Sequence, residues 1–270
     1  MDFDLDAYLA RIGYGGDRSP TAATLRALQR AHIYAIPFEN LDPLRGKVPS
    51  LAIDDLLAKL VHSPTRGGYC YEHNSLFAAA LRALGFRVTL LAARVRVGAS
   101  PGDVRPRTHM LMLVHAPGDP NRYLADVGFG NAGALLDPIP LAPADVLDHP
   151  RHHRLTVATT PDGPLESWTL QAFQNGEWRD QYEFTVEPFL APDFEVVNWH
   201  IATNPKSPFS TRRFATRTLP DRVLSLDGRT LTETHADGTT TRHELADENE
   251  VRKVLADTFG ITAPPDQPVP

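Results

Sequence analysis

The chain of 270 residues contains a single cysteine, Cys70, so no disulfide can form within it. Folding therefore does not require an oxidising compartment. The longest apolar runs, such as LLAARV, are far too short to cross a bilayer as a helix. The opening stretch, MDFDLDAYLARIG, is acidic and amphipathic, unlike a signal peptide. These features predict a soluble, cytoplasmic protein that does not bind membranes.

Positive charge is also scarce, because 27 lysines and arginines face 33 aspartates and glutamates and leave a formal net charge of −6. This balance argues against a general nucleic-acid-binding protein. It still permits one local basic patch for a phosphorylated small molecule. Lys206, Arg212 and Arg213 lie together in NPKSPFSTRR, although a run of charges is usually a solvated face. The composition, 42% hydrophobic and 22% charged, is typical of a globular protein with a substantial core.

The first part of the chain has the residue spacing of helices. Apolar residues recur at intervals of three and four, and glycines follow two of the stretches. Ser19 is a candidate N-cap, with Pro20 at the first helical position. The pattern predicts helices over residues 4–12, 19–36, 53–62 and 70–85.

From about residue 86 the apolar period changes to two, which is typical of strands. Strands without intervening helices suggest an antiparallel sheet or barrel. Further on, residues 223–245 contain two Asp-Gly pairs that predict hairpin turns, followed by a helix over 251–259. We expect the tail, 262–270, to be disordered. The fold class is therefore α+β in three parts, with central strands predicted over residues 86–97, 107–116, 122–129, 153–159, 168–178 and 181–187.

Cys70 lies in the stretch RGGYCYEHN, where a Gly-Gly turn precedes a predicted helix. A lone cysteine is most often a buried structural residue. A position at the start of a helix points instead to chemistry, because free backbone N–H groups and the helix dipole stabilise an anion there. The same N–H groups can receive an oxyanion during acyl transfer. Cys70 is therefore a candidate nucleophile, which needs a base and a group that orients the base.

His109 is the candidate base among 11 histidines. It lies in RTHMLMLV, on the strand face that carries two leucines, and Asp126 lies in YLADVGF on the same face as Leu124. A buried carboxylate is costly unless it is paired, and a histidine on an adjacent strand would pair with it. Each residue alone is more often structural. Together, Cys70, His109 and Asp126 form a consistent Cys-His-Asp set.

The adjacent His152 and His153 are a different case. Neighbouring residues point to opposite sides of an extended chain, and no third ligand lies nearby in the sequence. We interpret the RHHR stretch as a solvated turn, so no metal site is predicted.

The ordered blocks RGGYCYEHN, RTHMLML and ADVGFG resemble the arylamine N-acetyltransferase family. IPFENLD, at residues 36–42, and the later NPKSPFS are also similar to the family's pattern. The resemblance covers residues 1 to about 260. It implies a helical first domain over 1–86, an antiparallel β-barrel over 87–190 and an α/β lid over 191–270, built around a cysteine-protease-like core.

The resemblance also implies a reaction. Cys70, His109 and Asp126 would form a catalytic triad for ping-pong transfer of acetyl from acetyl-CoA. The acceptor would be an arylamine, arylhydroxylamine or arylhydrazine, and acetyl-Cys70 the intermediate. The backbone N–H groups of Cys70 and Tyr71 are candidate oxyanion donors. This chemistry needs no metal.

Further residues follow from the same resemblance. An aryl acceptor needs an apolar, aromatic pocket, and we expect it to be lined by Phe38, Val95, Phe129 and Phe209. On the donor side, we expect Thr108, Gly128 and Gly130 to border the channel for coenzyme A. Glu39 and Arg66 are expected to form an ion pair that supports the cysteine loop.

Three other functions stay open at this stage. An amide synthase that closes macrolactams would use the same triad with an acyl chain from a carrier protein. A cysteine peptidase would also use it, but it needs an extended peptide cleft. A non-catalytic binding module would retain the fold alone, and the intact Cys-His-Asp set argues against that.

Overall fold

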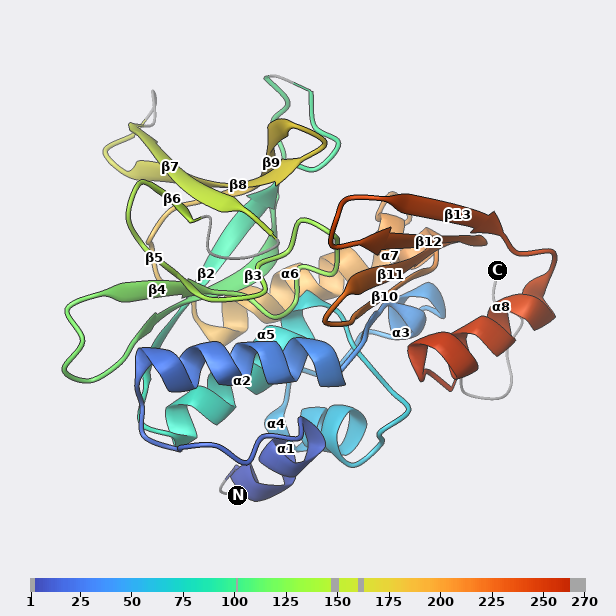
Figure 1. Ribbon diagram of the computed structural model, residues 1–270, viewed down its shortest axis with the longest axis horizontal. Coiled ribbons are helices and arrows are strands. Elements are labelled where there is room, and N and C mark those ends of the chain that lie inside the picture. Colours follow the sequence, from blue (N-terminus) through green and yellow to red (C-terminus); the bar gives the residue numbers. More distant parts are fainter. Residues whose placement is uncertain (1–2, 101, 147–150, 160–162, 263–270) are drawn as a thin grey trace.

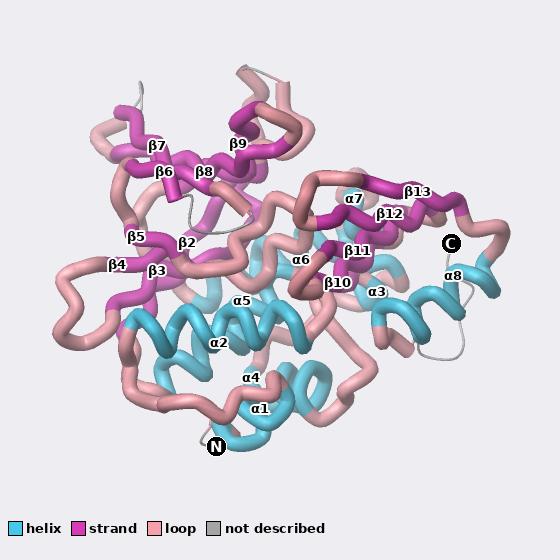
Figure 2. Tube along the Cα trace, in the orientation of Figure 1, coloured by secondary structure: helices cyan, strands magenta, loops and turns pink. Residues whose placement is uncertain are grey.

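The computed structural model describes residues 3–100, 102–146, 151–159 and 163–262. Figure 1 shows a group of N-terminal helices, an eight-stranded sheet above it and a five-stranded sheet to one side. Figure 2 shows how the helices gather below the large sheet, while α8 lies against the smaller one. The predicted disordered tail falls outside the described residues, apart from Thr262.

The N-terminal helices bury one apolar face each against a shared core. That core contains Tyr8, Leu25, Leu60, Leu76 and Phe77, all essentially inaccessible to solvent. The helices are α1 (Leu5–Arg11), α2 (Ala22–Ala35), α4 (Ile53–Leu56), which continues into a π-helical turn over Leu57–Val61, and α5 (Cys70–Ala83).

One predicted helix start is wrong. The N-cap of α2 is Thr21, whose side chain accepts a hydrogen bond from the backbone N–H of Thr24 at 3.2 Å. Ser19 instead binds Asp17, and Pro20 lies outside the helix. Ser and Thr are both favoured N-caps, so the sequence pattern alone does not separate two candidates two residues apart.

The large sheet is an antiparallel, nearly closed barrel in the order β5-β4-β3-β2-β9-β8-β7-β6. Leu91, Leu111, Leu170 and Phe184 fill its interior, and residues on the opposite face of its central strands pack onto the helices. Its strands are β2 (Arg87–Val95), β3 (Arg107–His115), β4 (Arg122–Ala125), β5 (Ile139–Pro140), β6 (Ala144–Val146), β7 (His153–Thr159), β8 (Glu166–Gln174) and β9 (Glu177–Phe184).

The second sheet joins distant parts of the chain. The two-residue strand β1 pairs with β10 from the C-terminal part, in the order β1-β10-β11-β12-β13. Both predicted Asp-Gly hairpin turns are confirmed, with Gly228 at φ +60° and Gly238 at φ +85°. The strands are β1 (Phe38–Glu39), β10 (Phe214–Thr218), β11 (Arg222–Asp227), β12 (Thr230–His235) and β13 (Thr240–Glu244).

The remaining helices cover the junctions between these parts. α3 (Leu41–Leu44) and α7 (Pro208–Thr211) are single turns, and α6 (Ala191–Thr203) connects the barrel to the second sheet. The last helix is α8 (Glu248–Val254), followed by a π-helical turn to Phe259. None of the helices within the described ranges has the length and apolar character needed to span a bilayer.

Candidate active site

Cys70 is the first residue of α5, as the sequence predicts, and only 6% of it is exposed. The Gly-Gly turn before it packs against Pro37–Glu39. The backbone N–H of Glu39 donates to the carbonyl of Gly68 at 2.8 Å. A Cβ on Gly67 would lie 2.0 Å from the carbonyl oxygen of Pro37, so only glycine fits there. This close packing sets the direction from which the chain enters the helix.

The structure brings the three chemically paired residues together. Nε2 of His109, in β3, donates to Oδ2 of Asp126 at 2.7 Å. Asp126 follows directly after β4 and is 1% exposed. The thiol of Cys70 lies close enough to the same imidazole to raise its pKa. Because Nε2 is engaged by Asp126, Nδ1 is the nitrogen left for the sulfur.

Two further hydrogen-bond donors offset the free-energy cost of burying the Asp126 carboxylate. The side-chain amide of Asn74 donates to Oδ1 of Asp126 at 3.0 Å, and the backbone N–H of Gly128 donates to the same oxygen at 2.9 Å. Asn74 also accepts from the backbone N–H of Val127. Sequence reasoning missed Asn74, although it lies one helical turn after Cys70 and therefore on the same face.

The environment of His109 favours its cationic form. Burial disfavours the imidazolium, but the charge and hydrogen bond of Asp126, with a smaller contribution from Cys70, raise the pKa of His109 to about 10. A cationic imidazole beside the sulfur stabilises a thiolate. The site can therefore hold a Cys–His ion pair oriented by a carboxylate.

Aromatic rings surround this set. Phe129 and Tyr182 lie edge-on or tilted to the His109 ring, with centroids 4.9 and 5.2 Å away. On the other side, Phe209 lies 6.3 Å from Phe38 and 6.1 Å from Tyr69. Three of the four predicted acceptor residues thus belong to rings near the cysteine. Sequence reasoning missed both tyrosines. Tyr182 lies in a strand without a distinctive motif, whereas Tyr69 lies in the RGGYCYEHN block itself.

The fourth predicted acceptor residue, Val95, lies at the end of β2. It pairs with Tyr182 of β9, two residues beyond the pairing of Ala93 with His109. Its position is next to the aromatic rings and at their periphery.

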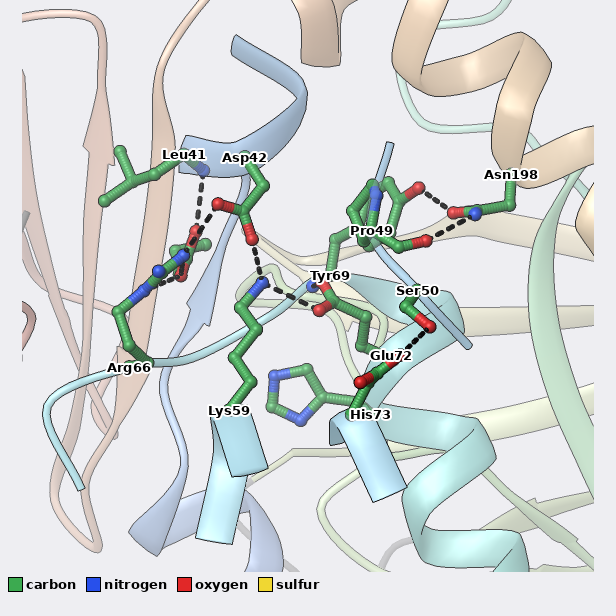
Figure 3. A network of polar contacts seen from close by, with 12 residues as sticks. Leu41, Asp42, Pro49, Ser50, Lys59, Arg66, Tyr69, Glu72, His73 and Asn198 are labelled. Carbon is green, nitrogen blue, oxygen red and sulfur yellow. Dashed lines mark hydrogen bonds and ion pairs between the residues drawn. The ribbon is translucent and has the colours of Figure 1, made fainter. Parts of the chain in front are cut away.

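A buried ionic network stands behind the cysteine turn (Figure 3). Arg66 contacts Glu39 at 2.9 Å and Asp42 at 3.2 Å. Lys59 contacts Asp42 at 2.6 Å and Glu72 at 2.7 Å. The sequence pointed to Glu39 and Arg66 and missed the other three, which come from elements far apart in the sequence.

Glu72 connects this network to α5, the helix that begins at Cys70. Its other carboxylate oxygen accepts from the backbone N–H of Tyr69 at 3.1 Å, which fixes the start of α5. Burial, opposed by the charge of Lys59, raises the pKa of Glu72 to about 7. Three carboxylates thus share two cations beneath Cys70.

The residues predicted for the donor side pack tightly. A Cβ on Gly128 would lie 2.8 Å from the Cα of Cys70, and one on Gly130 would lie 2.6 Å from the ring of Phe38. The carbonyl of Thr108 accepts from the hydroxyl of Tyr71 at 2.7 Å. Gly128 thus lies against Cys70, while Gly130 and Thr108 contact Phe38 and Tyr71. The contact of all three with coenzyme A stays a prediction.

The basic cluster expected in NPKSPFSTRR is largely neutralised. Arg212 pairs with Asp227, and Arg213, 5% exposed, pairs with Glu248 at 2.8 Å. Arg213 is therefore not a free phosphate-binding residue and does not lie on a solvated face. The polypeptide folds back and brings the start of α8 against it.

The interpretation of His152 and His153 as a solvated turn is wrong for His153. This residue begins β7 and is 3% exposed. Its ring nitrogens lie 3.1 and 3.0 Å from the carbonyl oxygens of Arg151 and Gly133, and a neutral imidazole donates to one of them. Burial lowers the pKa of His153 to about 4, so the ring is neutral. Across the described ranges, no three His, Cys, Asp or Glu side chains are arranged to hold a metal ion.

Known proteins resemble this chain along nearly its whole length. A family model described as N-acetyltransferase matches residues 21–267. The arylamine N-acetyltransferase of Mycolicibacterium smegmatis is 40% identical over 263 residues, which cover 97% of this chain and 93% of that protein. The arylamine N-acetyltransferase of Escherichia coli (strain K12) is 34% identical, covering 95% of this chain and 88% of that one.

Solved structures agree with the sequence matches. The Nocardia farcinica arylamine N-acetyltransferase superposes with a TM-score of 0.90 at 44% identity, covering 97% of this chain and 90% of its own. The Mycobacterium marinum arylamine N-acetyltransferase in complex with CoA superposes with a TM-score of 0.88 at 39% identity, covering 96% and 93%. Fold and sequence together define an enzyme of the acyltransferase class. The chain belongs to the arylamine N-acetyltransferase family.

Proposed function

We propose that the protein transfers acetyl from acetyl-CoA to an arylamine, arylhydroxylamine or arylhydrazine by a ping-pong mechanism through acetyl-Cys70. The observation that carries this proposal is the set Cys70, His109 and Asp126, in which the helix start, the imidazole and the carboxylate support one another. The Mycobacterium marinum relative with bound CoA supports the choice of donor.

In the first half-reaction the thiolate of Cys70 attacks the acetyl carbonyl of the thioester. The oxygen becomes an oxyanion, for which the backbone N–H groups of Cys70 and Tyr71 are the nearest free donors at the start of α5. Collapse of this intermediate breaks the bond to the sulfur of coenzyme A, which takes the proton of His109 and leaves as a thiol, so that His109 is neutral. Because one sulfur replaces another of similar basicity, the exchange is close to thermoneutral.

In the second half-reaction the amine attacks the acetyl carbonyl on Cys70. Acetylation removes the negative partner from His109 and so weakens its hold on a proton. Neutral His109 accepts the proton of the attacking amine, and Asp126 stabilises the imidazolium that forms. Collapse releases the amide and restores the Cys70 thiolate beside a protonated His109.

The acceptor pocket follows from the rings near the sulfur. Phe38, Phe129 and Phe209 offer apolar faces to an aryl ring, with Val95 at the periphery. Thr108, Gly128 and Gly130 would border the path of the pantetheine arm. Glu39 and Arg66 act from behind, by holding the turn before Cys70.

Isotope exchange tests the proposal. A ping-pong enzyme incubated with acetyl-CoA and labelled coenzyme A, without amine, moves the label into acetyl-CoA, and Cys70→Ser abolishes this exchange. Exchange that strictly requires an arylamine would contradict an acetyl-enzyme. Absence of exchange, together with acylation of Cys70 by a thioester on a carrier protein, would favour the amide-synthase alternative.

A further inference from the structure

Three buried polar side chains that the proposed reaction does not use form a continuous chain beneath the site. The hydroxyl of Tyr8, in α1, is 2.8 Å from Nδ1 of His32 in α2. Nε2 of His32 is 2.9 Å from Nδ1 of His73 in α5. Nε2 of His73 is 3.2 Å from the carbonyl oxygen of Pro37. All three side chains are at most 1% exposed.

Both histidines are neutral. Burial, with the positive charge of Arg11 on one side and the neighbouring His73 on the other, holds the pKa of His32 well below its usual range. Burial and the nearby Lys59 lower the pKa of His73 to about 4, against backbone contacts and a distant Asp126 that raise it. Each ring therefore carries one N–H and one lone pair.

The carbonyl of Pro37, at the end of this hydrogen-bond chain, fixes the position of every proton in the chain. A carbonyl can only accept, so Nε2 of His73 carries the hydrogen and its Nδ1 is an acceptor. Nε2 of His32 must then donate to that Nδ1, which leaves Nδ1 of His32 as an acceptor for the Tyr8 hydroxyl. The opposite direction of donation would place an unprotonated Nε2 of His73 against the lone pairs of the Pro37 carbonyl oxygen. The chain therefore has a single allowed direction, from Tyr8 to Pro37.

The carbonyl at its end belongs to the segment that shapes the cysteine turn. Pro37 contacts the position where Gly67 would carry a Cβ, and the next residue, Phe38, bridges to Gly68. The ring of His73 also stacks parallel to that of Phe38, at 10° and 6.4 Å. Figure 3 shows His73 just below Glu72, at the side of the ionic network.

We propose that Tyr8, His32 and His73 are positioning residues, which hold Pro37–Glu39 through one directed hydrogen-bond chain and thereby set the Cys70 turn against His109. This inference rests on the proposed function only in that Cys70 is the reactive group. None of the three belongs to the set Cys70, His109 and Asp126. The hydrogen-bond chain acts on the thiol through the contact of Pro37–Glu39 with the Gly67–Gly68 turn.

Histidine tautomers test the chain in the unmodified protein. Nitrogen-15 NMR at pH 7, with the two rings assigned through bonds, should show both His32 and His73 as neutral Nε2–H tautomers. A protonated ring, or an Nδ1–H tautomer in either residue, overturns the proposal. This measurement does not depend on whether any variant folds.

Thiol reactivity tests the positioning. Tyr8→Phe keeps the ring and removes the hydroxyl that donates to His32. We expect the turn to loosen and the Cys70–His109 pair to weaken. We expect iodoacetamide to alkylate Cys70 about three- to tenfold more slowly at pH 7, the effect of one buried hydrogen bond. The deficit should shrink at pH 9, where a thiolate forms without help. Tyr14→Phe, which removes a single hydrogen bond to Asp17 near the surface, is the matched control.

The outcomes separate cleanly. A lower melting temperature for Tyr8→Phe with an unchanged alkylation rate well below that temperature would mean a purely structural role and overturns the proposal. Alkylation needs no acetyl-CoA. A wild-type protein that is never acetylated would therefore refute the proposed function and leave this test valid.

Discussion

At the scale of single residues, three donors converge on one carboxylate. His109, Asn74 and the backbone of Gly128 all donate to Asp126, and every one of these contacts is buried. An acceptor-only side chain is therefore required at this position. This explains why a charged residue can follow directly after a buried strand.

Asp126→Asn replaces one acceptor oxygen with an amide donor. Either orientation of the amide sets a donor against a donor, and the imidazole loses the group that fixes its tautomer. We expect the acetyl-transfer rate to fall by about 10³-fold or more, by analogy with other triads. We also expect a loss of roughly 1–3 kcal/mol in the free energy of unfolding. Asp145→Asn, on the exposed strand β6, is the control for both assays.

The raised pKa of His109 gives a pH-dependent stability. The folded value of about 10 exceeds the usual 6.5, so protonated His109 contributes stability that is fully present below pH 6.5. That contribution is lost as pH rises toward 10. In urea unfolding, the stability gap between wild type and His109→Gln should therefore narrow from pH 6 to pH 10. A gap that is constant or widens over this range would contradict the assignment. His62→Gln, at an exposed position, should show no such trend.

Much of the site could be predicted at this scale. Cys70, His109 and Asp126 stand out because each residue type conflicts with its local pattern unless the other two are present. Asn74 and Tyr182 do not stand out, since a helical asparagine and a strand tyrosine are ordinary in themselves. Their contacts arise from the approach of β3, β9 and α5, which no local pattern contains.

At the scale of elements, the start of α5 depends on partners from several segments. Lys59 comes from the π-helical turn, Asp42 from α3 and Glu72 from α5 itself. Glu72 reaches back to the backbone of Tyr69 and fixes the first turn. The position of Cys70 is thus tied to the helix–helix packing around it.

Lys59→Met should destabilise the fold by about 3–5 kcal/mol, because it leaves the buried Asp42 and Glu72 without their shared cation. Urea unfolding at pH 7 measures this directly. Arg179→Met removes one member of an exposed pair and should cost less than about 1 kcal/mol. Equal effects of the two substitutions would show that the buried network adds no stability.

The regular elements could be predicted from the sequence, whereas their ends could be predicted less accurately. Period-two runs correspond to β2, β3, β7, β8 and β9, and the helical runs correspond to α1, α2 and α5. The stretch 53–62 divides into α4 and a π-helical turn, and this turn carries Lys59, whose ammonium contacts Glu72. The strand predicted over 122–129 ends at Ala125, where the chain turns to direct Asp126 at His109.

At the scale of the whole molecule, one side chain connects the N-terminal part to the C-terminal part. The amide of Asn40 donates to the carbonyls of Phe209 and Arg212, each at 2.7 Å, and accepts from the backbone N–H of Phe214 at 2.6 Å. Asn40 directly follows β1, whose pairing with β10 joins the same two parts. Phe209, which we propose to line the acceptor pocket, is held at this junction.

Asn40→Ala should loosen that junction and displace Phe209. We expect the KM for an arylamine to rise by about five- to thirtyfold. This corresponds to about 1–2 kcal/mol, the net contribution of one to two buried hydrogen bonds. Acetylation of Cys70 by acetyl-CoA should change by less than about twofold. Stopped-flow measurement of the two half-reactions separates these effects. An equal decline in both would mean that Asn40 supports the whole site rather than the acceptor side, and Asn121→Ala is a surface control.

The order of helices, barrel and second sheet could be predicted from the change of period along the chain. The pairing of β1 with β10 could not, because a two-residue strand carries no periodicity. The same holds for Arg213, whose partner Glu248 lies 35 residues further on. Long-range pairing depends on the assembled fold, and a single sequence records it only where a motif spans both partners.

The central claim is that Cys70 carries the acetyl group between the two substrates. Intact-protein mass after brief exposure to acetyl-CoA, without amine, tests it most directly, since Cys70 is the only thiol in the chain. We predict one acetyl adduct on the wild type, none on Cys70→Ala, and loss of the adduct when an arylamine or arylhydrazine is added. An unmodified wild-type mass under conditions in which the enzyme acetylates the amine would contradict the claim.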